Sequence, residues 1–293
     1  LLPNAPQPYS NISQTYILLG NYVESIKYAQ RAVELNPTFI DAYQNLIKAL
    51  IKSNLFEDAL NIVSRALDIA PKNDDILKLF TLVLEKTLFK EYDLSLDKKI
   101  DVLFDKNILG KSIPSLILRL EKHPDIEFIL SQLDNEIYFK DLSNIINKLN
   151  NIPNFLRIIS SGYNISLKIE MLLIKLRKEI LHNLKSYQDN NSVIIFHKAL
   201  TTQCFNNEFI FFNTDEENKN VRLLEKELEI CAEDNQLLSS LSLLSLGSYK
   251  NISNFDWARS ILYCEDIQDI FKLIISEPLL EKSIKPLLNQ ITE

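Results

Sequence analysis

Four polar residues stand close together in an otherwise apolar stretch: Gln203, Cys204, Asn207 and Glu208. Their amide, thiol and carboxylate groups suit two roles. They can line a binding pocket, or they can form buried hydrogen bonds that hold two helices together. We favour the structural role and keep the pocket as the alternative.

A thiol and an imidazole also occur near each other, at Cys204 and His197. Seven residues of helix place two side chains on one face but about 10 Å apart along the axis. That separation is too long for the hydrogen bond between a nucleophile and its base, so we predict no catalytic residue in the chain. His182, His197, Cys204 and Cys231 lack the close ligand pairs of structural zinc sites, and we therefore predict no metal site.

The composition favours an all-α fold. Hydrophobic residues make up 46% and charged residues 24% of the 293 residues, which is typical of a globular protein. Only four glycines occur, whereas tight hairpin turns and phosphate-binding loops both consume glycine. The net charge of −7 and the absence of a basic stripe argue against nucleic-acid binding.

The cysteines and the hydropathy pattern bear on location. Three well-separated cysteines do not form a disulfide framework and suit a reducing cytoplasm, so we expect a cytoplasmic protein. No apolar run is long enough to span a membrane, and we expect no membrane partner. The chain begins Leu1-Leu2-Pro3 without an initiator methionine, so we expect it to be a fragment of a longer protein.

A repeat of 34 residues is visible in the first part of the chain. Pro3, Pro37 and Pro71 are spaced by 34, and small residues and aromatics recur between them in register. This pattern resembles the tetratricopeptide repeat, a helical hairpin of the same period. We predict a short α-solenoid over residues 1–86, made of the tail of one unit, two full units and a degenerate unit. Its expected helices are 8–19, 22–35, 40–53, 56–69 and 74–86.

The resemblance implies a concave groove that is lined by the first helix of each unit. It places Gln14, Gln44, Asn45, Lys48 and Lys78 on or beside this groove. A groove of this kind binds an extended peptide or a partner helix of another protein. Two alternatives remain open, because the chain's own downstream helices could fill the groove, or the groove could serve self-association.

The best-known tetratricopeptide groove grips a terminal carboxylate with lysine, asparagine and arginine side chains. Asn45 matches one of these positions. The other positions carry different residues, namely Ser10, Gln14, Asp75 and Leu79. Because the set is incomplete, we do not expect carboxylate capture.

Residues 87–293 are expected to form an irregular all-helical domain without the 34-residue period. Thr214 to Glu217 read as a capping box that opens a long helix, and Ser95 reads as the cap of an earlier one. We expect a solvated face at Lys175, Arg177 and Lys178, and no strand. Helices are expected at 96–107, 113–122, 124–134, 136–149, 152–161, 167–184, 192–205, 206–212, 214–234, 236–247, 254–263, 266–276 and 278–290.

Two short motifs in this region, 199–211 and 277–281, are similar to stretches of bacterial tetratricopeptide proteins that carry an S-adenosylmethionine-dependent methyltransferase domain. The resemblance covers about 95–293 and implies a helical region that precedes the catalytic domain. The catalytic domain needs a glycine-rich turn, and this chain has no paired glycines. We therefore expect no cofactor in this chain, with S-adenosylmethionine bound by a separate C-terminal domain.

Together with this resemblance, these observations predict that the chain is the non-catalytic, partner-binding part of a larger protein. That larger protein would carry an S-adenosylmethionine-dependent methyltransferase domain. A freestanding tetratricopeptide adaptor is the first alternative. An enzyme with an unrecognised site in 87–293 is the second, although no residue pattern supports it.

Overall fold

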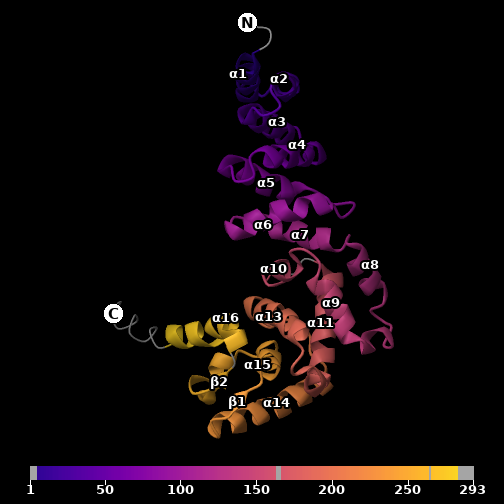
Figure 1. The fold of residues 1–293 in the computed structure, drawn as a ribbon, viewed down its shortest axis with the longest axis vertical. Helices are drawn as coiled ribbons and strands as arrows, with labels where there is room; N and C mark the ends of the chain where they lie inside the picture. Colours follow the sequence, from indigo (N-terminus) through magenta and orange to yellow (C-terminus); the bar gives the residue numbers. More distant parts are fainter. Residues whose placement is uncertain (1–4, 163–165, 264, 283–293) are drawn as a thin grey trace. The chain divides into compact units, whose positions relative to one another are not determined.

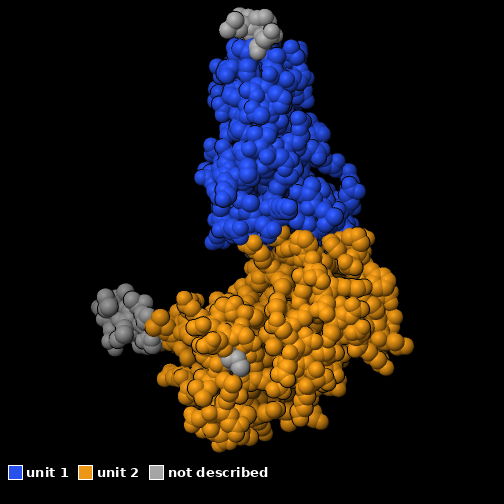
Figure 2. All heavy atoms as spheres, in the orientation of Figure 1, with its two compact units in different colours: residues 1–122 blue, residues 123–293 orange. Residues whose placement is uncertain are grey.

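The computed structural model describes residues 5–162, 166–263 and 265–282. The chain is all-α, as predicted, and its described residues contain only two strands of two residues each (Figure 1). It divides into two compact units, unit 1 (Leu1–Lys122) and unit 2 (His123–Glu293), which Figure 2 shows in different colours. Among the described residues, no helix is both long and apolar enough to cross a membrane.

Unit 1 begins with five helices that agree closely with the expected ones. They are α1 (Pro6–Leu18), α2 (Tyr22–Leu35), α3 (Ile40–Lys52), α4 (Phe56–Ile69) and α5 (Asp74–Lys86). Pro3 and its unit tail lie outside the described residues. Successive helices pack side by side, and α1, α3 and α5 also contact one another in order. The helical hairpins thus stack as a solenoid.

Small side chains allow this close packing. Ala29 and Ala32 on α2, and Ala59 and Ala66 on α4, are completely buried. A larger side chain at such a site would push the helices apart or force a strained rotamer, because protein interiors have little free volume. The alanine pattern of the sequence therefore becomes the contact surface between the helices.

The turns between paired helices explain why the repeat stops. Gly20 and Asn54 lie 34 residues apart, and both have left-handed backbone, with φ of 73° and 58°. Glycine and asparagine tolerate this conformation, which costs other residues free energy. The next residue in this series is Leu88. No left-handed turn forms there, and α5 instead packs against the later segments η2 (Gly110–Ser112) and α7 (Ile113–Leu120).

A buried arginine organises the end of unit 1, near η1 (Leu94–Leu96) and α6 (Asp97–Asp105). Arg119 on α7 forms an ion pair with Asp97 at 2.7 Å and donates to the Asp93 carbonyl at 2.6 Å. Its guanidinium lies 3.9 Å from the Tyr92 ring centre, and burial raises the pKa of the Tyr92 hydroxyl to about 12. The expected Ser95 cap is wrong, because Asp93 accepts the Ser95 N–H and no side chain caps α6.

Unit 2 is an irregular bundle around α13 (Asn191–Asn206), which packs against α9 (Leu142–Asn150), α10 (Phe155–Ile159) and α15 (Ser240–Gly247). Gly247 on α15 permits close approach, since an added Cβ would lie 3.1 Å from side-chain atoms of Thr201 and Ile252. The other elements of unit 2 are α8 (Pro124–Ser131), η3 (Tyr138–Lys140), α9 (Leu142–Asn150), α10 (Phe155–Ile159), α11 (Leu167–His182), α12 (Leu184–Tyr187), α14 (Asp215–Glu233), β1 (Leu237–Leu238), α15 (Ser240–Gly247), η4 (Ile252–Asn254), η5 (Asp256–Arg259), β2 (Leu262–Tyr263), η6 (Glu265–Ile267), α16 (Gln268–Phe271) and the π-helical η7 (Lys272–Ser276).

Several expectations for unit 2 are wrong. Residues 206–212 do not form a helix, because Glu208 and Phe209 both adopt left-handed backbone after α13 ends. The expectation of no strand also fails, since β1 and β2 form a short parallel pair. The region 254–263 consists of 3-10 turns and β2 rather than a helix. The expected helix 278–290 is helical up to residue 282, and the remainder lies outside the described residues.

Candidate functional site

The first helices of the repeats present two rows of side chains at the 34-residue spacing. One row runs through Ser10, Gln44 and Lys78, and the other through Gln14, Lys48 and Leu82. Gln14, Lys48 and Lys78 are exposed and Gln44 is half-buried. We call the surface formed by Gln14, Gln44, Lys48, Lys78 and Leu82, where the sequence predicts a groove, the repeat groove face. Leu82 was missed in the sequence, although its spacing from Lys48 could have revealed it; it is 40% exposed.

Asn45 has a different environment from the other groove residues. It is only 7% exposed, and its amide nitrogen donates to the carbonyl and the hydroxyl of Ser10 at 3.1 and 3.0 Å. The amide thus ties α3 to α1. This hydrogen bond is internal to the solenoid, so the Asn45 amide nitrogen is already engaged.

The two lysines of the repeat groove face make few contacts within the chain. Lys48 has no ion-pair partner among the described residues, and Lys78 makes only an exposed pair with Asp75 at 3.6 Å. An exposed pair of this kind contributes about 0–1 kcal/mol and exchanges easily for a ligand contact. The face therefore offers two ammonium groups, two amides and one apolar side chain.

The polar motif near residue 204 lies at the end of α13. Gln203 is buried and accepts a hydrogen bond from the Gly162 N–H at 3.2 Å, which joins α13 to the segment after α10. Cys204 is buried, Asn207 is half-buried, and Glu208 is exposed. The motif is thus divided between the interior and the surface.

The thiol and the imidazole of α13 are both uncharged at neutral pH. Burial, together with the nearby Arg177 charge, lowers the pKa of His197 to about 3. Burial also raises the pKa of the Cys204 thiol to about 12. His197 pairs through Nε2 with the Ser245 hydroxyl at 3.2 Å. Both pKa shifts oppose the formation of a thiolate–imidazolium pair.

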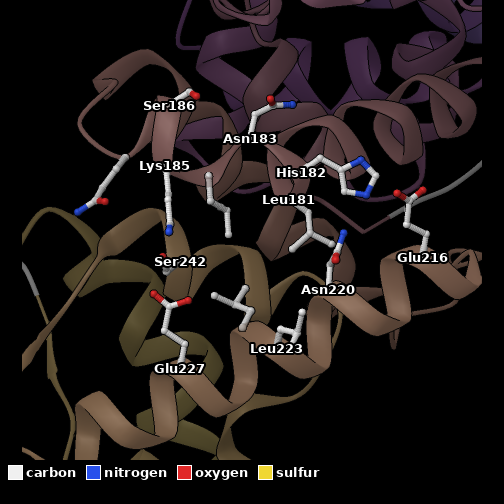
Figure 3. A pocket seen from close by; sticks show the side chains of 13 residues that line it. Leu181, His182, Asn183, Lys185, Ser186, Glu216, Asn220, Leu223, Glu227 and Ser242 are labelled. Atoms are coloured by element: carbon white, nitrogen blue, oxygen red, sulfur yellow. The ribbon is translucent and has the colours of Figure 1, made fainter.

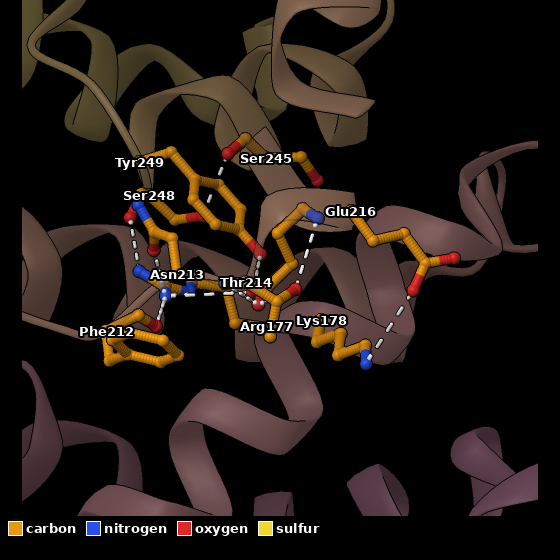
Figure 4. A network of polar contacts seen from close by, with 10 residues as sticks. Arg177, Lys178, Phe212, Asn213, Thr214, Glu216, Ser245, Ser248 and Tyr249 are labelled. Carbon is orange, nitrogen blue, oxygen red and sulfur yellow. Dashed lines mark hydrogen bonds and ion pairs between the residues drawn. The ribbon is translucent and has the colours of Figure 1, made fainter. Parts of the chain in front are cut away.

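Arg177 is the centre of a buried polar network in unit 2 (Figure 4). The expectation that it lies on a solvated face is wrong, because its side chain is only 1% exposed. It donates to the Ser248 carbonyl at 3.2 Å, to the Phe212 carbonyl at 3.0 Å and to Asn213 Oδ1 at 2.7 Å. These contacts join α11 to the loop after α13 and to the end of α15.

Glu217 supplies the negative charge of this network. Its carboxylate lies 3.8 Å from the Arg177 guanidinium and accepts a hydrogen bond from the Tyr249 hydroxyl at 2.8 Å. The other carboxylate oxygen accepts from Thr214, as the expected capping box requires. The Tyr249 ring lies 4.1 Å from the guanidinium carbon, and burial raises the pKa of its hydroxyl. The network joins α11, α14 and the end of α15 and acts as a structural centre, in which the buried Arg177 Nε has no hydrogen-bond partner among the described residues.

Metal-ligating residues do not gather in the part of the chain that the structure describes. No group of three histidine, cysteine, aspartate or glutamate side chains there is arranged to hold a metal ion. Cys264, which is one of the three cysteines, lies outside the described residues.

Comparison with known proteins matches residues 16–81 to a tetratricopeptide-repeat family model. A stretch of 75 residues is 29% identical to the Hsp70-Hsp90 organizing protein 2 of Arabidopsis thaliana, and covers 26% of this chain and 13% of that protein. A stretch of 78 residues is 28% identical to the small glutamine-rich tetratricopeptide repeat-containing protein 2 of Mycosarcoma maydis, and covers 27% of this chain and 22% of that protein. The similarity thus spans less than a quarter of either relative.

The family match begins within α1 and ends within α5, where the stacked hairpins are found. The 34-residue proline spacing, the buried alanines and the paired left-handed turns agree with it. Residues 16–81 therefore resemble tetratricopeptide repeats in sequence and in helix stacking, and we call the five stacked helices of residues 5–86 the tetratricopeptide segment.

Proposed function

We propose that this chain is a protein–protein interaction module and that its repeat groove face binds an extended segment of a partner protein. The observation that carries the proposal is the exposure of Gln14, Lys48 and Lys78 on the first helices of a tetratricopeptide segment. One relative is, by its name, an organizing protein for Hsp70 and Hsp90, which supports a binding role.

The chemistry of the face suggests how it holds a segment. Gln14 and Gln44 amides can pair with both the N–H and the carbonyl of an extended backbone. Lys48 and Lys78 favour acidic side chains or carbonyl oxygens, while Leu82 offers an apolar contact. Because Ser10, Asp75 and Leu79 replace the cationic residues of a carboxylate clamp, the proposed ligand is an internal segment rather than a chain terminus.

The proposal can be tested with a displayed peptide library selected against the full chain. The affinity of one selected peptide is then measured by fluorescence anisotropy. We expect the Gln44→Ala, Lys48→Ala and Lys78→Ala triple variant to weaken binding by about tenfold or more, since a few contacts dominate most interfaces. The matched control is Lys27→Ala with Gln30→Ala and Arg65→Ala, which changes exposed residues of the same kinds on α2 and α4.

Equal losses in the two triple variants would contradict the groove assignment. Amidation of the peptide's C-terminus tests the second part of the proposal. We expect it to change the affinity by less than about twofold, because no complete carboxylate clamp is present. A loss of most of the affinity on amidation would show terminal-carboxylate capture instead.

We further propose that the chain is the non-catalytic part of a tetratricopeptide protein with an S-adenosylmethionine-dependent methyltransferase domain. This proposal rests on the motifs 199–211 and 277–281. The matched family model and the two relatives do not support it. The gene sequence beyond the Glu293 codon tests it. A strand followed by a glycine-rich turn within about 60 residues is expected, because the cofactor needs that turn. A stop codon near Glu293 would overturn it in favour of a freestanding adaptor.

A further inference from the structure

Three hollows in the surface of unit 2 follow one side of α14. Their volumes are about 680, 620 and 580 Å³. The first and second hollows share His182, Asn183 and Glu216 as lining residues. The second and third share Gln188, Glu227 and Ser242. The three hollows therefore lie next to one another along α14, and together we call them the α14 groove.

The floor of the α14 groove is a single helical face. Glu216, Asn220, Leu223, Glu227 and Cys231 line it and recur at steps of three or four residues. Such residues lie above one another on a helix, and fifteen residues of helix span about 22 Å. An extended peptide of about seven residues has the same length. The groove is therefore long enough for a chain segment.

The middle of the groove places charged and apolar groups around one space (Figure 3). Lys185 of α12 points toward Ser242, while Asn220, Leu223 and Glu227 project from α14 into the same hollow. Leu223 is 58% exposed and offers apolar surface. Lys185 and Glu227 make no ion pair with any described residue, so both charges are open to a ligand.

The charge of the groove changes along its length. The third hollow is lined by Asp189, Glu227 and Asp266, and no lysine, arginine or histidine is among its described lining residues. The Asp266 carboxylate accepts the Ser240 hydroxyl at 2.7 Å and makes no ion pair with a described residue, while Lys198, which pairs with Asp269 at 2.8 Å, donates to the Asp266 backbone carbonyl at 2.9 Å. The first hollow has lysines, but they are partly engaged, with Lys178 paired to Glu216 at 4.0 Å. One end of the groove is therefore strongly acidic.

We infer that the α14 groove binds a segment of a partner protein that carries lysine or arginine residues. The cationic side chains of this partner segment contact Asp189, Glu227 and Asp266, and one of its apolar side chains contacts Leu223. Charge complementarity selects this occupant, because a hollow lined by three carboxylates, with no lysine, arginine or histidine among its described lining residues, attracts basic groups and repels phosphates. The site lies wholly within unit 2 and is distinct from the repeat groove face of unit 1.

The test uses the full chain and a fluorescein-labelled peptide of alternating arginine and leucine, about eight residues long to match the groove. A peptide of alternating glutamate and leucine is its charge-reversed partner. We expect anisotropy to show binding of the arginine peptide only. Raising the salt from about 50 to about 500 mM should weaken that binding several-fold, because salt screens exposed charges.

The decisive variant is Asp189→Asn with Glu227→Gln, which keeps the side-chain shapes and removes two charges. We expect it to weaken the arginine peptide about tenfold. The matched control, Glu229→Gln with Glu233→Gln, removes two exposed carboxylates of the same helix that do not line the groove. Trp257 is the only tryptophan of the chain and lies buried in unit 2, so its fluorescence verifies that each variant is folded.

Covalent attachment of the peptide to a cysteine locates its binding site independently of the affinity measurements. Cys231 lines the acidic end of the groove, whereas Cys204 is buried. In a Cys264→Ser background, an arginine peptide with a bromoacetyl group at one end should alkylate Cys231, as mapped by mass spectrometry. An equal rate with the glutamate peptide would contradict charge-directed binding.

Three outcomes would overturn the inference. Equal weakening by the matched control would show attraction to the acidic surface in general. Binding of both peptides would show an apolar site, and displacement by spermidine at matched charge with no preference for the peptide would show a site for small polyamines. The Lys48→Ala and Lys78→Ala changes should leave arginine-peptide binding unchanged, so this site and the repeat groove face can fail separately.

Discussion

The tetratricopeptide segment and unit 2 bury polar groups in different ways. Within residues 5–86, the buried polar side chains are short and neutral: Ser10, Ser13, Ser25 and Asn45. In unit 2, charged or ionisable groups are buried, notably Arg177, Glu217 and His197. The hairpins repeat the same contacts between small side chains. Unit 2 instead joins segments that are distant in the sequence through one buried network around Arg177. We therefore expect a single substitution to lower the free energy of unfolding most where the contact that it removes occurs only once.

Arg177 provides the most severe test of this comparison. We expect Arg177→Met to reduce the free energy of unfolding of unit 2 by about 3–5 kcal/mol, because it leaves the Glu217 carboxylate buried without its cation. The measurement is urea unfolding followed by Trp257 fluorescence, which reports unit 2 alone. The matched control is Arg222→Ala, an exposed arginine on α14, which should change stability by less than about 0.5 kcal/mol.

A double variant separates the buried charge from simple loss of packing. In Arg177→Met with Glu217→Gln, no charge remains unpaired, so part of the lost stability should return. If the double variant is as unstable as the sum of the two single variants, the charge pair is not the organising feature of unit 2.

His197 gives a smaller effect that depends on pH. Its pKa is about 3 in the folded chain and about 6.5 when unfolded, so between these values only the unfolded chain binds the proton. The contribution of the neutral His197 to the free energy of unfolding is complete above pH 6.5. It declines by about 1.4 kcal/mol per pH unit as the pH falls below that value. Between pH 6.5 and pH 5 the loss is about 2 kcal/mol.

The Trp257 unfolding curve at a series of pH values measures this slope. His197→Gln removes the titrating group and should flatten the slope in this range. The comparison would be weakened if the wild type and the variant showed the same pH dependence, since the buried imidazole would then contribute nothing.

The repeats could be predicted from the sequence because their determinants are local and recur. The proline and alanine spacing gave α2, α4 and α5 residue for residue. The capping box at Thr214 was also visible, since its two residues are three positions apart. Such signals depend on neighbours in the chain rather than on the tertiary fold.

The buried centre of unit 2 could not be predicted in this way. Arg177 stands between lysines in an amphipathic stretch, and its hydrogen-bond partners are 35 to 71 residues away. The turn at Glu208 and Phe209 was also not predicted. Neither residue type favours the left-handed backbone that both adopt after α13. Asn45 shares its position with a ligand-binding residue of the family, yet its partner is Ser10.

Gly20 offers the mildest test, within the repeats. Its φ is 73°, and an added Cβ would meet no atom within 4 Å, so the cost of Gly20→Ala comes from the backbone alone. A left-handed alanine costs about 1–2 kcal/mol, and the lower entropy of the unfolded chain offsets part of this, which leaves about 1 kcal/mol. Far-UV circular dichroism during urea unfolding should show the loss while the Trp257 transition stays unchanged. Gly20→Asn should cost less, because Asn54 already adopts this conformation at the equivalent turn. Equal costs for the two variants would mean that the left-handed turn does not limit the repeat.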